Sequence, residues 1–218
     1  MQYLFFDFDG TIADSHVGIL NGVHYMVAQL GLPDLGDEVY RTFIGPSLSS
    51  SLIRTYPQLT EDQIKVAIKH YQKIYSETGI FEMRLFPGLT EVLTQLKGAG
   101  YSLNIASAKP EPMIDRIVAH FKLGEWFDGC YGATLDETVR GTKAQVLAYA
   151  LDNAGATPDA SLMIGDTDSD IRGGQANHVE TLGVTYGFGS RASLVAAGAD
   201  LLIDRVDELP GAINQLLA

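Results

Sequence analysis

The sequence predicts an α/β protein in which a parallel sheet is interrupted, after its first strand, by an inserted helical segment. From Pro87 onward, short apolar runs alternate with segments of helical periodicity, which is typical of parallel strands joined by crossover helices. Residues 15–82 contain only helical patterns. At two distant points, Asp7 and Asp166 follow directly after an apolar run, as expected where strands end at the ligand-binding edge of an open sheet.

The inserted segment is predicted to contain four helices. Apolar residues recur at helical spacing over residues 17–30, and a second helix is predicted over residues 37–43. Ser47 is a candidate cap for a third helix that runs to about residue 56. Thr60 begins the fourth, because Gln63 lies three residues later and completes a capping-box pattern. These boundaries predict two domains: a helical cap over residues 15–82, and an α/β core formed by residues 1–14 and 83–218.

The core elements follow from the alternation of apolar runs with amphipathic segments. Strands are predicted over residues 3–7, 101–106, 161–164, 180–186 and 200–203, with a short strand near Cys130. Helices are predicted over residues 89–99, 111–121, 142–154, 170–176 and 192–197, and the C-terminus is also predicted to be helical.

Composition excludes several classes of protein. The 218 residues are 46% hydrophobic and carry a formal net charge of −12, which leaves no basic surplus for nonspecific nucleic-acid binding. Cys130 is the single cysteine, so neither an intrachain disulfide nor a thiolate metal cluster is expected. No charged leader precedes an apolar stretch, and no apolar run reaches about 18 residues, the length of a membrane span. We expect a cytoplasmic monomer or homodimer that binds no membrane.

Two acids after the first strand suggest catalytic chemistry. Asp7 and Asp9 are two residues apart, and alternate residues of extended backbone face the same way. Gly10 then allows the chain to turn at once. Asp7, at the strand end, is suited to nucleophilic attack, and Asp9 to proton exchange with a leaving group and with water. Acids after a strand more often begin a turn, but a second acid-rich strand end favours the functional interpretation.

That second strand end is followed by Asp166, Asp168 and Asp170. Their spacing resembles the start of a calcium loop, but Ile171 stands where such a loop needs glycine and Asn177 where it needs glutamate. Carboxylates brought together in a fold repel one another unless a cation holds them, and Mg²⁺ is the usual ion beside phosphate. We expect Asp166 to ligate Mg²⁺ directly and Asp170 to ligate it through water or to orient a ligand.

Two further positions could contact an anion. Ser107 ends the strand over residues 101–106, where its hydroxyl could hold phosphate oxygens. Lys109 could contribute there, or it could be a solvated loop lysine. Lys143 precedes a helix and in isolation fits a surface position, but the acidic cluster requires a fixed positive charge. The segment Gly187-Phe188-Gly189 is interpreted as a loop, because it lacks the third glycine of a dinucleotide fingerprint.

These motifs together resemble the haloacid dehalogenase-like hydrolase superfamily. Residues 6–15 (FDFDGTIADS) are similar to its first motif, Ser107 to the second, Lys143 to the third, and residues 165–170 (GDTDSD) to the fourth. The helical insert resembles the small C1 cap of that superfamily, and several stretches across the whole chain resemble its phosphoglycolate phosphatase-like branch. His178 departs from the pattern, since a glycine is usual there. The resemblance implies a Rossmann-like core.

The resemblance also implies a role for each matching residue. Asp7 would attack phosphorus and form an aspartyl-phosphate, while Asp9 would protonate the leaving alkoxide and then deprotonate water. Mg²⁺ would be held by Asp7, the backbone carbonyl of Asp9 and Asp166, with support from Asp170. The phosphate-binding groups implied by the resemblance are Thr11, Ser107, Ala108 and Lys143.

The expected function is Mg²⁺-dependent hydrolysis of a small phosphorylated metabolite resembling phosphoglycolate. Phosphosugar mutase, pyrophosphatase and 5′-nucleotidase activities use the same kind of core and stay open. Asp9 disfavours dehalogenation, which does not need an acid at that position. Phosphonate cleavage would need a Schiff-base lysine, for which Lys65, Lys69 and Lys73 are available, although they form a regular stripe typical of a solvated helix face. A catalytically silent phosphate-binding protein is the alternative from another class.

Overall fold

The computed structural model describes residues 1–136 and 138–217, and the chain divides into two compact units. One unit comprises Met1–Asp14 with Leu85–Ala218, and the other Ser15–Arg84. Ala218, the last residue of the predicted core, lies outside the described residues. None of the helices in the described ranges is long and apolar enough to cross a membrane.

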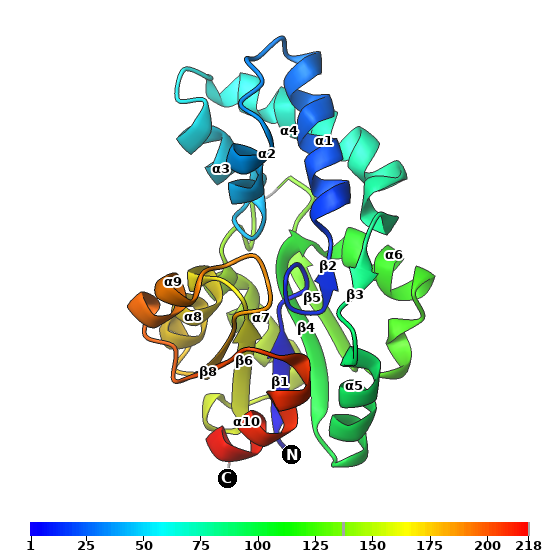
Figure 1. The fold of residues 1–218 in the computed structure, drawn as a ribbon, viewed down its shortest axis with the longest axis vertical. Coiled ribbons are helices and arrows are strands. Elements are labelled where there is room, and N and C mark those ends of the chain that lie inside the picture. Colours follow the sequence, from blue (N-terminus) through cyan, green and yellow to red (C-terminus); the bar gives the residue numbers. More distant parts are fainter. Residues whose placement is uncertain (137, 218) are drawn as a thin grey trace. The chain divides into compact units, whose positions relative to one another are not determined.

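The first unit contains a six-stranded parallel sheet, which confirms the predicted α/β class (Figure 1). Its strand order is β5-β4-β1-β6-β7-β8, so the first strand of the chain lies at the centre of the sheet. The strands are β1 (Tyr3–Phe6), β4 (Ser102–Pro110), β5 (Gly129–Ala133), β6 (Ser161–Gly165), β7 (Glu180–Val184) and β8 (Leu201–Ile203). A separate two-stranded sheet consists of β2 (Ala13–Asp14) and β3 (Arg84–Leu85).

Helices cover both faces of the six-stranded sheet, as right-handed crossovers require. Helices α7 and α8 pack on one another and on the strands of one face, and α8 also contacts α9, while α5 and α6 lie on the opposite face (Figure 1). The helices are α5 (Leu89–Gly98), α6 (Glu111–His120), α7 (Lys143–Ala154), α8 (Asp168–Ala176), α9 (Arg191–Ala197) and α10 (Leu209–Leu216), with 3₁₀ turns η3 (Leu123–Glu125), η4 (Pro158–Ala160) and η5 (Val206–Glu208).

A fully apolar cluster fixes α7 against the centre of the sheet. Phe5 of β1, Ala106 of β4 and Met163 of β6 are completely buried and pack with residues of α7 such as Val146 and Leu147. Burial of each large apolar side chain contributes roughly 1.5–3 kcal/mol to folding. The three central strands and the helix that follows β5 are therefore held as one rigid body, which determines where the residues after each strand lie.

Two element boundaries differ from the sequence-based expectation in ways that affect function. Strand β4 was predicted to end at residue 106 but continues to Pro110, so that Ser107 and Lys109 are both part of the strand. Helix α8 was predicted to begin at Asp170 but begins at Asp168. It starts earlier because the Asp170 carboxylate accepts hydrogen bonds from the N–H and the hydroxyl of Thr167, at 3.0 and 2.8 Å, and so caps the first turn.

His178, at the position where a glycine is usual, has left-handed backbone with φ of 58°. It lies directly after the C-cap of α8. The N–H groups of His178 and Val179 donate to the carbonyls of Gln175 and Gly174, at 3.1 and 2.9 Å, which is the hydrogen-bond pattern of a Schellman motif. The departure from glycine therefore keeps the backbone conformation that the helix end requires.

The second unit is all-helical. It consists of α1 (His16–Gln29), α2 (Asp37–Tyr40), η1 (Arg41–Phe43), α3 (Leu48–Thr55), α4 (Glu61–Glu77) and η2 (Gly79–Phe81). Helix α1 packs against α4, and Gly22 of α1 makes room for the ring of Tyr71, because a Cβ at Gly22 would lie 2.6 Å from that ring. Thr60 and Gln63 form the predicted capping box at the start of α4.

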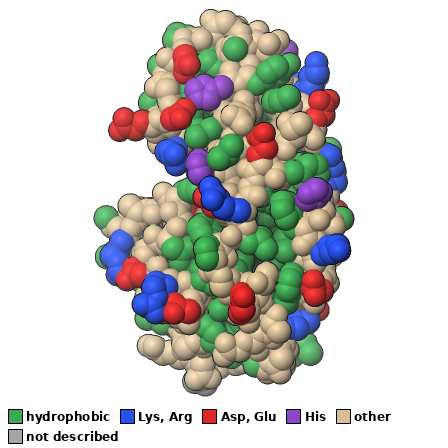
Figure 2. Space-filling view, turned by 45° about the vertical axis from the view of Figure 1, so that its right-hand side comes forward, with side chains coloured by type: hydrophobic (Ala, Val, Ile, Leu, Met, Phe, Trp, Pro, Cys, Tyr) green, Lys and Arg blue, Asp and Glu red, His purple; other side chains and the backbone are tan. Residues whose placement is uncertain are grey.

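The molecular surface carries charges of both signs. On the face seen in Figure 2, acidic and basic side chains are interspersed among polar and apolar ones. One exposed pair joins Arg191, at the start of α9, to Asp204, which follows β8, with the nearest nitrogen and oxygen 2.6 Å apart. Exposed pairs of this kind contribute at most about 1 kcal/mol to stability. The buried ion pairs of the site described next have far larger electrostatic consequences.

Candidate active site

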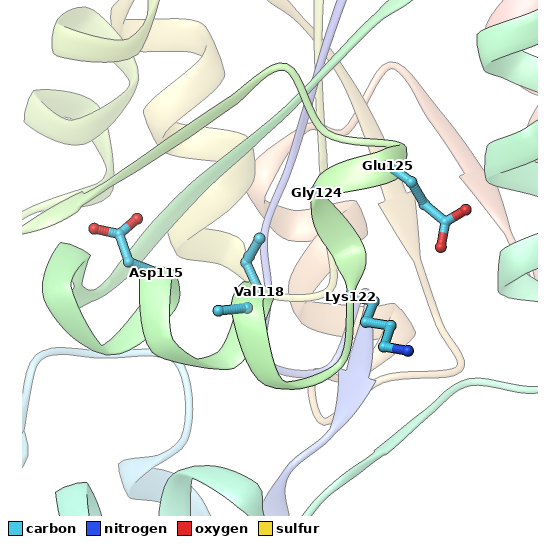
Figure 3. Close-up of a pocket in the computed structure, with 6 residues that line it drawn as sticks. Asp115, Val118, Lys122, Gly124 and Glu125 are labelled. Atoms are coloured by element: carbon cyan, nitrogen blue, oxygen red, sulfur yellow. The ribbon is translucent and has the colours of Figure 1, made fainter.

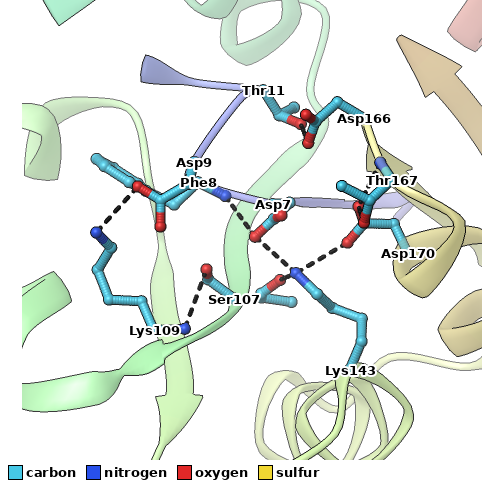
Figure 4. Close-up of polar contacts among 11 residues, drawn as sticks. Asp7, Phe8, Asp9, Thr11, Ser107, Lys109, Lys143, Asp166, Thr167 and Asp170 are labelled. Atoms are coloured by element: carbon cyan, nitrogen blue, oxygen red, sulfur yellow. Dashed lines mark hydrogen bonds and ion pairs between the residues drawn. The ribbon is translucent and has the colours of Figure 1, made fainter. Parts of the chain in front are cut away.

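The register of the sheet brings the two acid-rich segments to one edge. Phe6 of β1 is opposite Ile105 of β4 on one side and Ile164 of β6 on the other. Asp7 comes one residue after Phe6 and Asp166 two residues after Ile164, so both emerge at the same edge from neighbouring strands (Figure 4). The N–H of Asp7 continues the ladder by donating to the carbonyl of Ile164 at 2.8 Å.

Lys143 is the cationic centre of this edge. Its Nζ lies 2.6 Å from Oδ1 of Asp7 and 2.9 Å from Oδ1 of Asp170, and its side chain is only 2% exposed. It also donates to the carbonyl of Ala106 at 3.2 Å. Lys143 is the first residue of α7, so the cluster that packs this helix on the sheet also delivers the ammonium group to the carboxylates. Lys143 thus lies inside the acidic cluster, not on the surface.

The buried charges shift one another's protonation. Burial raises the pKa of Asp7 to about 6, since it outweighs the opposing effect of Lys143, and the nearby Asp170 carboxylate adds to the increase. Burial, together with Asp170 and Asp7, also raises the pKa of Asp166 well above its usual range. Burial alone would lower the pKa of Lys143, but Asp170 and Asp7 raise it, so the lysine is firmly protonated. One ammonium group does not neutralise three buried carboxylates.

The three carboxylates fit a divalent cation. One oxygen each from Asp7, Asp166 and Asp170 lie within 4.8 Å of one another, and all three residues are buried. Oδ2 of Asp170 accepts hydrogen bonds from Thr167, whereas Oδ1 faces the cluster and contacts the ammonium group of Lys143. Such an all-oxygen, negatively charged set is the donor chemistry that Mg²⁺ prefers. The Asp9 carboxylate is not part of this set.

Asp166 is fixed by groups that the sequence did not reveal. Its Oδ2 accepts hydrogen bonds from the N–H groups of Phe188 and Gly189, at 2.7 and 3.3 Å, and the Thr11 hydroxyl lies 3.4 Å from Oδ1. A Cβ at Gly187 would lie 2.4 Å from the Asp166 side chain, and one at Gly189 would lie 1.8 Å from its carbonyl. The loop after β7 therefore supports this carboxylate. The paired glycines were the signal that could have indicated it.

Asp9 has a lysine of its own. Its Oδ1 lies 2.9 Å from Nζ of Lys109, whose side chain is 4% exposed, and Lys109 is not a solvated loop residue (Figure 4). Ser107 is also buried, and its hydroxyl lies 3.4 Å from the N–H of Lys109. Ala108, between them, is half-buried.

The predicted site residues are thus gathered at one sheet edge. Asp7, Asp166, Asp170 and Lys143 form a single cluster, Asp9 lies beside it with Lys109, and Thr11 lies against Asp166. A separate shallow pocket is formed by α6 and the turn that follows it (Figure 3). Its lining residues are Asp115, Val118, Ala119, Lys122, Gly124 and Glu125, none of which belongs to the acidic cluster.

Comparison with known sequences identifies relatives over most of the chain. The haloacid dehalogenase-like hydrolase family matches residues 4–184. A 5′-nucleotidase from Pseudomonas aeruginosa is 37% identical over 195 residues, 88% of this chain and 86% of that protein. Tyrosine-protein kinase PtkA from Mycobacterium tuberculosis is 31% identical over 98% of this chain and 72% of its own. A phosphoglycolate phosphatase from Pseudomonas putida is 26% identical over 96% of this chain and 79% of its own.

Comparison with solved structures identifies the same fold over almost the whole chain. A crystal structure of a predicted phosphatase from Clostridium acetobutylicum superposes with a TM-score of 0.94 and is 35% identical, over 98% of both chains.

Proposed function

The chain belongs to the haloacid dehalogenase-like hydrolase family and to its phosphoglycolate phosphatase-like branch, as its motifs predict, and we propose that it is a Mg²⁺-dependent phosphatase acting on a small phosphorylated metabolite. The observation that carries the proposal is the separation of the two acids after β1. Asp7 lies among carboxylates and Lys143, while Asp9 lies beside Lys109. Two carboxylates in distinct surroundings suit the two roles, nucleophile and proton carrier.

In the proposed first step, a carboxylate oxygen of Asp7 forms a bond to phosphorus as the bond to the ester oxygen breaks. Asp9 gives its proton to that oxygen, so that a neutral alcohol leaves. In the second step, Asp9 takes a proton from water, the water oxygen bonds to phosphorus, and the bond between phosphorus and Asp7 breaks. Inorganic phosphate is released, and both acids return to their starting states.

Lys143 and Ser107 are proposed to hold the phosphoryl oxygens, with the backbone of Ala108 and the hydroxyl of Thr11 as further contacts. Lys143 also favours the ionised form of Asp7, because its ammonium group lies 2.6 Å from the carboxylate that must attack. Mg²⁺ held by Asp7, the Asp9 carbonyl, Asp166 and Asp170 would supply positive charge that offsets the charge of the phosphoryl group. Preorganised charge of this kind is the main need of phosphoryl transfer.

The substrate class is best tested with a panel of phosphate esters and pyrophosphate, which is an anhydride. Phosphoglycolate, nucleoside 5′-monophosphates, sugar phosphates and pyrophosphate should be compared with and without Mg²⁺. Nucleoside monophosphates are the second candidate, because the Pseudomonas aeruginosa relative with 37% identity is named a 5′-nucleotidase. Inactivity on every ester at any Mg²⁺ concentration would reject the proposal. Transfer of phosphate from ATP to a tyrosine peptide, without ester hydrolysis, would instead point to a kinase.

Two further expectations accompany the proposal. We propose a cytoplasmic location, which fractionation of cells would test, and a monomer or homodimer in solution. Light scattering coupled to size-exclusion chromatography would distinguish the monomer from the dimer, and a higher oligomer would contradict both.

A further inference from the structure

We propose that Lys109 is a positioning residue that holds the Asp9 carboxylate in the orientation from which it transfers protons. The inference rests on the proposed function, because it assumes that Asp9 protonates the leaving group. It concerns a residue outside the four motifs, whose role the sequence left open between an anion contact and a solvated lysine.

The contact itself is close and buried. Nζ of Lys109 lies 2.9 Å from Oδ1 of Asp9, and the two side chains are 4% and 12% exposed. Lysine is almost never fully buried unless it is paired, because removal of an ammonium group from water costs several kcal/mol. The Asp9 carboxylate is therefore a charge partner that helps Lys109 to remain buried. In Figure 4 the two lysines approach residues 7–9 from different sides, Lys143 toward Asp7 and Lys109 toward Asp9.

An irregularity in β4 directs Lys109 toward Asp9. Ser107 is opposite Gly132 of β5, but the next paired residue, Pro110, is opposite Ala133, so β4 has two extra residues at this point. Bulges of this kind turn side chains away from the regular pleat and are frequent beside active sites. The bulge requires a glycine on the partner strand, because a Cβ at Gly132 would lie 2.5 Å from the Lys109 carbonyl. Glu111 closes it by accepting the Gly132 N–H at 3.1 Å.

The ammonium group has a second contact on the same segment. It lies 5.6 Å from the ring centre of Phe8, the completely buried residue between the two acids. An aromatic face within about 6 Å attracts a cation. Lys109 thus contacts both Phe8 and Asp9, which limits the rotation of the Asp9 side chain just before the chain turns at Gly10.

Lys143 does not duplicate this function. Its Nζ is shared between Asp7 and Asp170, and it belongs to a different element, α7. A proton carrier must come within about 2.6–3.2 Å of the atom that it serves, and small errors in its placement lower the rate steeply. Lys109 is therefore expected to influence the steps that use Asp9 and to have little influence on attack by Asp7.

The test uses substrates that differ in their need for a proton. With an alkyl phosphate, the leaving alkoxide requires protonation, whereas 2,4-dinitrophenolate leaves without it. In Lys109→Met, kcat/KM for an alkyl phosphate should fall by about 10²-fold, which is the lower limit for loss of general acid catalysis. For 2,4-dinitrophenyl phosphate, kcat/KM should change by less than about threefold. Lys109→Arg, which keeps the charge, should recover part of the loss. Lys65→Met, at a lysine that is 69% exposed on α4, is the matched control and should change neither substrate.

A double-mutant cycle keeps the proposal falsifiable if Lys109→Met folds poorly. Asp9→Asn removes the carboxylate, so the double variant leaves no buried charge unpaired. If Lys109 acts through Asp9, adding Lys109→Met to Asp9→Asn should change kcat/KM by less than about threefold. Equal losses for both substrates, or additive effects in the cycle, would overturn the proposal and indicate a direct contact with phosphate. If the wild type hydrolyses neither substrate, the proposed function fails first.

Discussion

Asp7 and Asp9 are the same amino acid two residues apart, but their surroundings differ. Asp7 faces two other buried carboxylates, Asp166 and Asp170, and shares the single ammonium group of Lys143 with Asp170. Asp9 lies beside that cluster, and its carboxylate is 2.9 Å from Nζ of Lys109. The carboxylates around Asp7 outnumber the single ammonium group there, which fits a cation, whereas Asp9 faces a lysine that Asp7 does not contact. The difference teaches that the neighbouring strands and helices, more than residue type, determine what each acid can do.

The largest effect is expected from removal of the acid in the crowded environment. Asp7→Asn should lower kcat/KM by more than about 10⁴-fold for every phosphate ester, irrespective of the leaving group, because the nucleophile itself is lost. Phosphate release measured at saturating Mg²⁺ tests this. Residual turnover within about tenfold of the wild type would show that Asp7 is not the nucleophile and would remove the basis of the comparison.

Removal of Asp9, the acid beside Lys109, should have a smaller and more selective effect. Asp9→Asn should lower kcat by about 10²- to 10⁴-fold on an alkyl phosphate, because proton transfer is lost, while the affinity for inorganic phosphate changes little. Steady-state kinetics and competitive inhibition by phosphate measure the two quantities. A variant that keeps its kcat but loses phosphate affinity would assign Asp9 to binding.

The two lysines provide a comparison on the scale of stability. Lys143→Met leaves two buried carboxylates without their cation and should destabilise the metal-free protein by about 3–5 kcal/mol, the usual cost of breaking a buried pair. Lys109→Met leaves only one carboxylate, which is 12% exposed, and should cost less. Urea unfolding in EDTA measures both. Mg²⁺ should restore more stability to Lys143→Met than to Lys109→Met, and equal losses and equal recoveries would contradict the comparison.

The smallest effect in this series is a dependence on pH. The pKa of Asp7 is raised from 3.8 to about 6, chiefly by burial, so the folded state keeps a proton that the unfolded state has already released. The free energy of unfolding should therefore fall as the pH rises from about 4 to 6. In EDTA, the free energy of unfolding of the wild type should fall by up to about 3 kcal/mol more than that of Asp7→Asn across this window. Parallel pH profiles for the two proteins would show that Asp7 is not perturbed.

Much of the fold follows from local patterns in the sequence. The apolar runs before Asp7 and Asp166 locate two central strands, and the spacing of Thr60 and Gln63 locates a helix start, because each depends only on neighbouring residues. The start of α8 was misplaced, since the Asp170 carboxylate turns back to cap Thr167. The spacing of apolar residues contains little information about such hydrogen bonds between a side chain and the start of a helix.

Site residues that belong to sequence motifs could be predicted. Contacts that depend on how two strands pair could not. Asp7, Lys143 and Asp166 stand in recognisable motifs, and the structure brings them together. The contact between Lys109 and Asp9 depends on a bulge between two strands, and no pattern within one strand reveals how it pairs with another. The support of Asp166 by residues 187–189 depends likewise on packing between a loop and a side chain far apart in the chain.

The glycines around Asp166 are positions that should stay unchanged if the protein is redesigned. Gly10, Gly187 and Gly189 each approach this aspartate so closely that even alanine would overlap it, at 2.1, 2.4 and 1.8 Å respectively. In a mutational library that diversifies these three sites, most clones would carry a displaced Asp166, through its side chain or its backbone. Libraries aimed at new substrates should keep these three glycines constant and vary other positions.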